Sequence, residues 1–397
     1  MKNRYDVVFL PLHREIGKII ASEVYWAVNT FRTISKVFRI EAFVGNLSEN
    51  GRNHLEESSG VIVSYGMNSE RTIFNDFLFY FLILKSGLKN IFSAQILHHY
   101  GSFGYLQGFN PSFFLPKLGK KYVIGPILYP TNDPPDTALK LGFIKKTHQY
   151  GKLMRKLFCV FHTLTLSRAD VIIFDTVATR QIYLRKYKLL LNKKIYIIPG
   201  GGIDPVEFYS ATLDLSHKEN VILGIASNLI KRKNIDKIIC AMNSVGSKVK
   251  LRIAGEGPEM ETLISLVRQL SLTDRVDFCG RIDHNSIREF YNSIDVYVAL
   301  DNAPTEAKIS VQEAMMCGCT IISGESEVPN GFDLRDWGII VNPTDVDKVA
   351  LALGKICHDF QLLNVMRYDA LKYAQIHFSS NSVLKELKNV YDKLLTQ

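Results

Sequence analysis

Two groups of polar residues in the second half of this 397-residue chain have types and spacing that suit a phosphorylated ligand. Ser227 to Asn234 (SNLIKRKN) places three consecutive cations after the apolar run Val221 to Ala226. Asp301 to Glu313 follows a second apolar run, Val296 to Leu300, and leads into a predicted helix that opens at Ser310. Anions bind at helix N-termini and at the carboxyl ends of parallel strands. The cations therefore suit a diphosphate.

Glu313 has two interpretations. Together with Ser310 it forms the pattern Ser-x-x-Glu, a capping box in which the glutamate bonds back to the N–H of the cap residue. Alternatively, its carboxylate accepts hydrogen bonds from ribose hydroxyls. Both uses place the side chain at the start of the helix, and the spacing leaves them open.

Neither a metal nor a cofactor is expected from the remaining motifs. The turn Gly255-Glu256-Gly257-Pro258 lacks the third glycine of a dinucleotide fingerprint, and no HExxH, CxxC pair or P-loop occurs. The string Asp345-Val346-Asp347 follows Asn342-Pro343-Thr344 and opens a helix, where acidic side chains favour the helix N-terminus.

Strands and helices are expected to alternate in both halves of the chain, which predicts an α/β fold with two parallel sheets. Predicted strands cover 6–10, 38–44, 60–64, 91–97, 122–124, 171–174 and 195–198, then 221–226, 250–254, 276–279, 296–300, 320–322 and 338–341. Gly200 to Gly202 between the halves is either an interdomain hinge or a linker. Two Rossmann-like domains, 1–205 and 206–377, facing across a cleft would place a ligand there.

Charge is distributed unevenly between the halves. Residues 1–205 carry 27 Lys+Arg and 14 Asp+Glu, whereas residues 206–397 carry 21 and 25. The basic half favours an anionic surface such as phospholipid or a phosphorylated lipid carrier. Residues 137–168 mix basic and aromatic side chains, so this stretch either rests on a membrane or is a solvated basic helix face. Nucleic-acid binding would explain the charge but none of the motifs.

The longest apolar run, Phe77 to Leu84, is eight residues long, far short of the roughly 20 that a spanning helix needs. The six cysteines are scattered and nothing at the start of the chain looks like a signal peptide. The sequence thus predicts a cytoplasmic protein, peripheral at the inner face of the cell membrane.

Four stretches together resemble the family 4 retaining glycosyltransferases, the group 1 glycosyltransferases of GT-B fold. They are IPGGGIDPVEF (198–208), LIKRKNID (229–236), IAGEGPEMETL (253–263) and TEAKISVQEAMMCGCTII (305–322). A further segment, 98–126, looks like the matching part of a bacterial and archaeal polysaccharide branch. The resemblance covers nearly the whole chain, and it implies that a C-terminal helix, about 378–397, packs back on the first domain.

The resemblance also implies roles for individual residues. Lys233 matches a diphosphate-binding lysine, Glu313 the second glutamate of a Glu-x7-Glu motif that holds the ribose, and His98 or His99 a histidine near the transferred sugar. The implied catalytic residues are His99, His98 and Glu306. The implied donor-binding residues are Lys233, Asn228, Arg232, Gly255, Gly257, Arg281, Thr305, Ser310, Val311, Glu313 and Gly17.

The sequence departs from the family pattern at three positions. Asn228 stands where the family has an arginine, and a single Gly17 where a glycine pair is common. Thr305 stands where the first glutamate is expected, with Glu306 one residue away. These departures favour a second hypothesis: a catalytically weak or inactive GT-B subunit that works beside an active transferase. A third is another GT-B enzyme, such as an epimerase or phosphorylase.

The function implied by the resemblance is transfer of a sugar, with retention, from a nucleotide-diphosphate sugar. The donor would be a UDP- or GDP-sugar and no other cofactor is expected. The acceptor would be a glycan or lipid-linked saccharide in polysaccharide or glycoconjugate synthesis.

Overall fold

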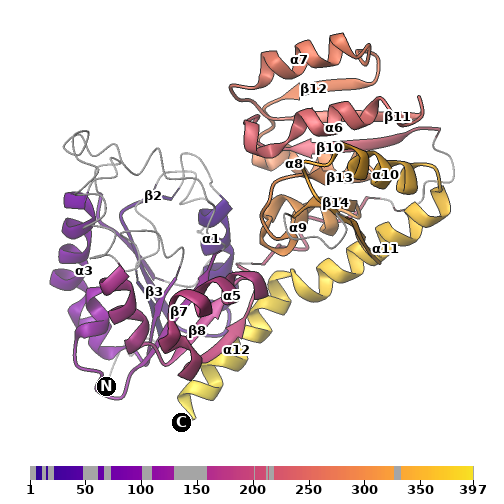
Figure 1. Cartoon of the computed structure of the whole chain (residues 1–397). Helices are drawn as coiled ribbons and strands as arrows, with labels where there is room; N and C mark the ends of the chain where they lie inside the picture. The colour runs from indigo at the N-terminus through magenta and orange to yellow at the C-terminus, as the bar shows by residue number, and fades with distance from the viewer. Residues whose placement is uncertain are drawn as a thin grey trace. The chain divides into compact units, whose positions relative to one another are not determined.

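The computed structural model describes residues 6–10, 15–16, 22–47, 61–66, 73–100, 110–128, 159–200, 202–211, 213, 219–325 and 332–396. The chain divides into two compact units (Figure 1). The first comprises Met1–Gly202 and Ser380–Gln397, and the second comprises Ile203–Ser379. The last helix of the chain therefore belongs to the first unit.

The first unit contains a seven-stranded parallel sheet in the order β5-β3-β1-β6-β7-β8-β9. Its strands are β1 (Val7–Phe9), β3 (Ile40–Val44), β5 (Val61–Ser64), β6 (Ile96–His99), β7 (Lys121–Ile127), β8 (Val171–Phe174) and β9 (Lys194–Ile197). Two short strands, β2 (Glu15–Ile16) and β4 (Asn46–Leu47), pair separately.

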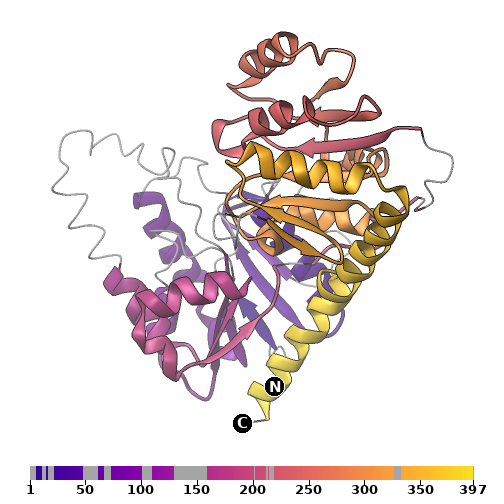
Figure 2. The same cartoon turned by 45° about the vertical axis from the view of Figure 1, so that its right-hand side comes forward.

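Helices cover both faces of this sheet. On one face, α1 (Ser22–Ile34) and α12 (Ser380–Leu395) share a buried core with the strands. Figure 2 shows α12 as the yellow helix at the C-terminal end of the chain. In α12 the apolar side chains at 383, 387, 390 and 394 recur at helical spacing, which explains why this helix packs by one stripe. On the other face lie α3 (Ile73–Ser93), α5 (Val177–Lys186) and the short 3₁₀ helices η1 (Pro111–Phe114) and η2 (Lys188–Asn192).

The second unit repeats the architecture, with strand order β12-β11-β10-β13-β14-β16-β15. Its strands are β10 (Val221–Ala226), β11 (Val249–Ala254), β12 (Val276–Gly280), β13 (Val296–Ala299), β14 (Thr320–Gly324), β15 (Phe332–Arg335) and β16 (Gly338–Val341). All neighbours pair in parallel except β15 with β16, which are antiparallel. The helices are α6 (Ile235–Met242), α7 (Met260–Gln269), α8 (Ile287–Asn292), α9 (Ile309–Met316), α10 (Val346–Cys357) and α11 (Phe360–His377), with 3₁₀ turns η3 (Lys231–Lys233), η4 (His284–Ser286) and η5 (Thr305–Ala307).

Strand order defines where each sheet can bind a ligand. In the second unit the chain proceeds from β10 outward to β11 and β12, and then returns to the other side of β10 as β13. The sheet therefore has a topological switch point between β10 and β13. In open α/β sheets, ligands bind outside the carboxyl ends of the strands at such a point.

One predicted strand, 91–97, starts too early. The structure continues α3 to Ser93 and starts β6 only at Ile96. Ile83, Gly87 and Ile91 recur every four residues on the buried face of α3, so the apolar run after Gly87 belongs to the helix. Gly87 allows close packing, because a Cβ there would lie 2.7 Å from Cζ of Phe43.

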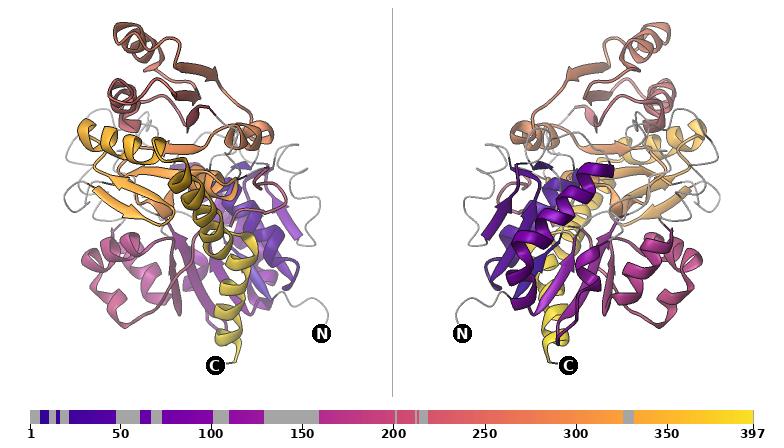
Figure 3. Two further views of the ribbon diagram at one scale, coloured as in Figure 1. Left: turned by 90° about the vertical axis from the view of Figure 1, so that its right-hand side faces the viewer. Right: turned by 90° about the vertical axis from the view of Figure 1, so that its left-hand side faces the viewer.

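Some expected features lie outside the described residues, namely Gly17 and most of the basic stretch 137–168, of which 159–168 is helical. Among the helices that the structure describes, none has the length and apolar character needed to cross a bilayer. Figure 3 shows the ribbon from two opposite sides, with α3 in front in the right-hand view.

Candidate functional site

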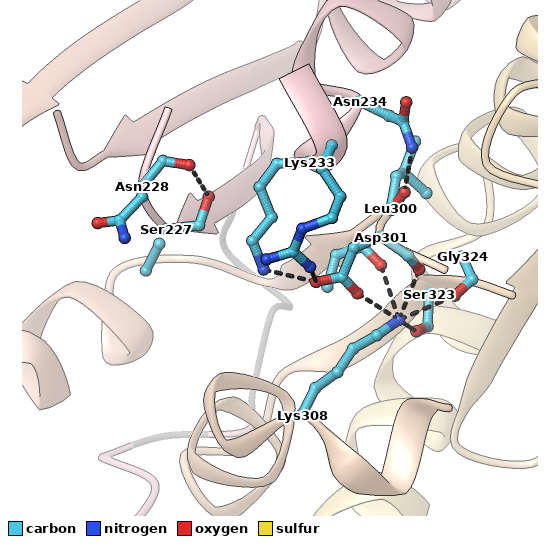
Figure 4. Close-up of polar contacts among 12 residues, drawn as sticks. Ser227, Asn228, Lys233, Asn234, Leu300, Asp301, Lys308, Ser323 and Gly324 are labelled. Carbon is cyan, nitrogen blue, oxygen red and sulfur yellow. Dashed lines mark hydrogen bonds and ion pairs between the residues drawn. The ribbon is translucent and has the colours of Figure 1, made fainter. Parts of the chain in front are cut away.

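Asp301, two residues after β13, is surrounded by three cations (Figure 4). Its carboxylate is 5% exposed and lies 2.5 Å from Nζ of Lys233, 3.0 Å from Nζ of Lys308 and 3.8 Å from Nη1 of Arg232. Burial raises the pKa of Asp301, but the ammonium groups of Lys308 and Lys233 lower it by a larger amount. The pKa of Asp301 is therefore below its ordinary value. Three cations thus surround one carboxylate at the switch point, and the charge of Glu325 acts on Lys308 from the end of β14.

Lys308 holds this cluster together from inside. The side chain is buried, and its ammonium donates to Oγ of Ser323 at 2.8 Å, to the carbonyl of Gly324 at 2.8 Å and to the carbonyl of Asp301 at 3.1 Å. Burial lowers the pKa of Lys308, and the Asp301 carboxylate opposes that change. With its protons directed at β13 and β14, Lys308 is a structural cation. Sequence reasoning missed it, although a lysine beside an apolar helix start invites a search for its partner.

Lys233 is placed by the turn that follows it. Asn234 has φ +50°, a left-handed conformation that asparagine tolerates better than most residues, and its Nδ2 donates to the carbonyl of Leu300 at 2.7 Å. This bond ties η3 to the end of β13. The Lys233 side chain remains 27% exposed, so its ammonium can contact both Asp301 and a ligand. Asn228, after β10, is exposed at the same edge of the sheet.

Gly255 and Gly257 have a packing role. A Cβ on Gly255 would lie 1.9 Å from the carbonyl oxygen of Ser227, and one on Gly257 would lie 2.3 Å from that of Leu229. Both glycines therefore let the loop after β11 pack directly against the loop after β10. Arg281, which follows β12, is exposed.

The capping-box interpretation of Ser310 and Glu313 is wrong. The N-cap residue of α9 is Lys308, so Glu313 lies too far along the helix to bond back to it. The N–H of Val311, expected at the phosphates, donates to the carbonyl of Lys308 at 3.1 Å. Ser310 is half-buried.

Glu313 instead points into the unit. Its Oε2 accepts a hydrogen bond from the hydroxyl of Tyr291 at 2.8 Å. Burial raises the pKa of Glu313 to about 8; the Tyr291 bond opposes this shift, and the charge of Glu207 adds to it. Further hydrogen-bond donors would lower the pKa of the Glu313 carboxyl, because donors favour its ionised form.

Thr305 stands where the family pattern has its first glutamate. The side chain of another glutamate, which follows β14, contacts Thr305. Oε1 of Glu325, the residue after β14, accepts bonds from the N–H of Thr305 at 2.8 Å and from its hydroxyl at 2.7 Å. The side chain of Glu306 lies outside the parts that the structure describes.

The two histidines at the end of β6 lie in the first unit. His98 is fully buried; its Nε2 is 2.7 Å from the carbonyl of Gly125 and its Nδ1 is 2.6 Å from the hydroxyl of Tyr391. The carbonyl can only accept, so Nε2 carries the proton and Nδ1 accepts from Tyr391. Burial lowers the pKa of His98 to about 3. His98 is thus a neutral core residue that binds α12 to the sheet.

His99 is the last residue of β6. It is also buried, and its Nδ1 is 3.1 Å from Nδ2 of Asn110. The first unit has its own switch point between β1 and β6, and His99 lies at the carboxyl end of β6. Of the two histidines, His99 is therefore the one whose position suits a substrate contact.

Two Rossmann-like α/β units, each with a mainly parallel sheet, are typical of the GT-B fold, and a solved structure agrees over nearly the whole chain. The Anabaena protein HepE in complex with UDP aligns with a TM-score of 0.69 at 13% identity, covering 98% of this chain and 100% of that one. Residues 205–373 match the family described as Glycosyl transferases group 1. The second unit therefore contains a domain of this family.

Curated relatives match over a shorter length. N-acetyl-alpha-D-glucosaminyl L-malate synthase of Bacillus anthracis is 26% identical over 184 residues, which are 46% of this chain and 47% of that protein. The capsular polysaccharide biosynthesis glycosyltransferase CapM of Staphylococcus aureus is 25% identical over 225 residues, 53% of this chain and 58% of that protein. The chain spans about half the length of the curated relatives it matches.

Proposed function

We propose that this protein transfers a sugar, with retention, from a nucleotide-diphosphate sugar to a saccharide acceptor. The observation that carries the proposal is the Asp301 cluster at the β10/β13 switch point, where three cations surround one carboxylate and favour the binding of an anion. A diphosphate leaving group needs such preorganised positive charge as its bond to the sugar breaks.

Each site residue then has a part in that reaction. Lys233 and Arg232 bind the diphosphate, while Asp301 and Lys308 hold these side chains in place before the ligand arrives. Glu313 accepts hydrogen bonds from the ribose. The charge comes from fixed side chains, so little reorganisation is needed when the leaving group forms.

UDP is the first nucleotide to test as donor base, because HepE was crystallised with UDP and shares the fold. GDP is the second, because a Mycobacterium tuberculosis relative of 28% identity is named as a GDP-mannose-dependent mannosyltransferase. The acceptor class follows from CapM, which is named for capsular polysaccharide synthesis. A glycan or lipid-linked saccharide acceptor suits these names.

Lys233→Ala tests the diphosphate site. Losing a hydrogen bond between charged groups costs about 1.5–3 kcal/mol, so UDP or GDP affinity should fall roughly tenfold to a hundredfold in isothermal titration calorimetry. Lys231→Ala is the matched control, because Lys231 lies in the same turn but is exposed and has no ion pair with Asp301 among the described contacts. Equal losses in the two variants would contradict the assignment.

Measuring turnover distinguishes an active transferase from an inactive GT-B subunit. Nucleotide release from UDP- and GDP-sugars should be measured with and without membrane extract. Release that Lys233→Ala removes supports the transferase. Nucleotide binding without release from any donor would favour the non-catalytic partner subunit, as the Asn228 and Thr305 departures suggest.

A further inference from the structure

The contact between Thr305 and Glu325 joins two segments 20 residues apart. Both donors of Thr305, its N–H and its hydroxyl, bond to one carboxylate oxygen, Oε1 of Glu325. The backbone of Glu325 is fixed as well, since its N–H donates to the carbonyl of Val341 at 3.0 Å. Glu325 is therefore held by β16 through its backbone and by η5 through its carboxylate.

Glu325 lies beside the cation cluster. The preceding residue, Gly324, accepts a hydrogen bond from Lys308, whose ammonium also pairs with Asp301. Neighbouring strands are about 4.8 Å apart, so the end of β14 is one strand spacing from the end of β13. A group attached to a diphosphate at Asp301 would thus lie within reach of the end of β14.

The chemistry of Glu325 suits a sugar. Its side chain is only half-buried, unlike that of Thr305. An ionised carboxylate has about four lone-pair sites, and the two bonds from Thr305 both go to Oε1. Sugar hydroxyls are donors that a second carboxylate oxygen can accept, and a negative charge also favours the positive charge that develops on a sugar as it leaves diphosphate.

We propose that Glu325 binds the hydroxyls of the donor sugar and determines which sugar is accepted, supplying from β14 the carboxylate that is missing at position 305. This assignment rests on the proposed function, because it requires a nucleotide sugar at the Asp301 cluster. Thr305 is then a positioning residue that orients the carboxylate.

Glu325→Gln tests the assignment in the full-length protein. Glutamine keeps an acceptor oxygen for Thr305 and nearly the same shape, so the fold should be retained. Dissociation constants are measured for UDP, UDP-glucose and UDP-N-acetylglucosamine, and for GDP and GDP-mannose. For the nucleotide that the wild type binds, the variant should keep its nucleotide affinity within about twofold and lose about tenfold or more for the sugar conjugate. Glu289→Gln, an exposed glutamate paired with Arg288, is the matched control and should change neither.

Thr305→Val removes the hydroxyl and keeps the N–H. It should weaken binding of the sugar conjugate in the same direction as Glu325→Gln but less. If Glu325→Gln weakens nucleotide and nucleotide sugar equally, or only lowers the melting temperature, Glu325 merely caps η5 and the assignment is overturned. If the wild type binds neither UDP nor GDP, the proposed function itself fails, a result distinct from selective failure of Glu325.

Discussion

Glu313 makes donor binding depend on pH. Burial raises its pKa to about 8, so near neutral pH most of this carboxyl is protonated in the unliganded protein. Ribose hydroxyls that donate to it favour the ionised form, so binding below that pKa releases a proton. Affinity for UDP-glucose, whose diphosphate diester does not titrate in this range, should rise roughly tenfold from about pH 6.5 to about pH 8.5 and then level off.

Glu313→Gln separates this cause from other titrations. The amide can still accept from Tyr291, but it does not ionise, so affinity should be lower at high pH and nearly constant across the range. Calorimetry in buffers of different ionisation enthalpy measures the proton released. A wild type whose affinity is flat with pH would show that the Glu313 carboxyl is not in contact with the bound donor.

At this scale, sequence reasoning found the residues that carry a family pattern and missed those that hold them. Lys233 and Glu313 could be named because they match positions of the family motif. Lys308 and Glu325 could not, because their partners lie on β13, β14 and η5, and strand adjacency is not visible in a linear sequence. The same limit left His98 and His99 as alternatives until the contacts of His98 with Tyr391 and Gly125 were known.

At the scale of elements, a buried ion pair joins α11 to the sheet of the second unit. Nη1 of Arg367 is 3.6 Å from Oδ1 of Asp295, and Nε donates to the carbonyl of Gly318 at 2.7 Å. Both charged side chains are at most 3% exposed. Removing one partner of such a pair leaves a buried charge uncompensated. Arg367→Ala should therefore lower the free energy of unfolding by about 3–5 kcal/mol.

Arg335→Ala is the control for that prediction. Arg335 also pairs with a carboxylate, Asp333, at 2.7 Å, but its side chain is 51% exposed, so the cost should be about 0–1 kcal/mol. Urea denaturation followed by circular dichroism measures both. If the two variants lose similar stability, the Arg367 pair contributes no more than a surface pair.

Elements with strong periodicity were predicted with errors of a few residues, and the failures have physical causes. The strands β10, β11 and β13 fall within one residue of their predicted starts. The strand predicted at 91–97 starts too early because the apolar residues after Gly87 fit a buried strand as well as the buried face of a helix. The antiparallel β15 was not predicted at all, since its residues FDLR are mixed in character and are paired only through β16.

At the scale of the molecule, the two units differ in charge and in what they expose. The second unit carries the cation cluster at its switch point, whereas the first carries a helix with an apolar face open to solvent. On α3 a stripe of exposed residues combines large apolar side chains with lysines. This α3 stripe consists of Leu78, Phe81, Lys85, Leu88, Lys89 and Phe92. Aromatic and basic side chains on one helix face favour an anionic membrane surface.

The α3 stripe gives the membrane hypothesis a testable form. Phe81 and Phe92 are 60% and 40% exposed, and Nζ of Lys120 lies 4.9 Å from the ring centre of Phe92. Phe81→Ser/Phe92→Ser should lower flotation with vesicles of phosphatidylglycerol and phosphatidylcholine, because about 25 cal/mol is lost for each Å² of apolar surface no longer buried in lipid.

Lys85→Gln/Lys89→Gln should also lower flotation, because the free energy of membrane binding falls by about 1 kcal/mol per lysine, and only when the vesicles are anionic. The control is Val365→Ser/Tyr368→Ser, which removes exposed apolar side chains from α11 in the second unit and should leave flotation unchanged. Equal flotation on neutral and anionic vesicles would exclude the electrostatic part, and equal loss in the α11 variant would exclude a specific role for α3.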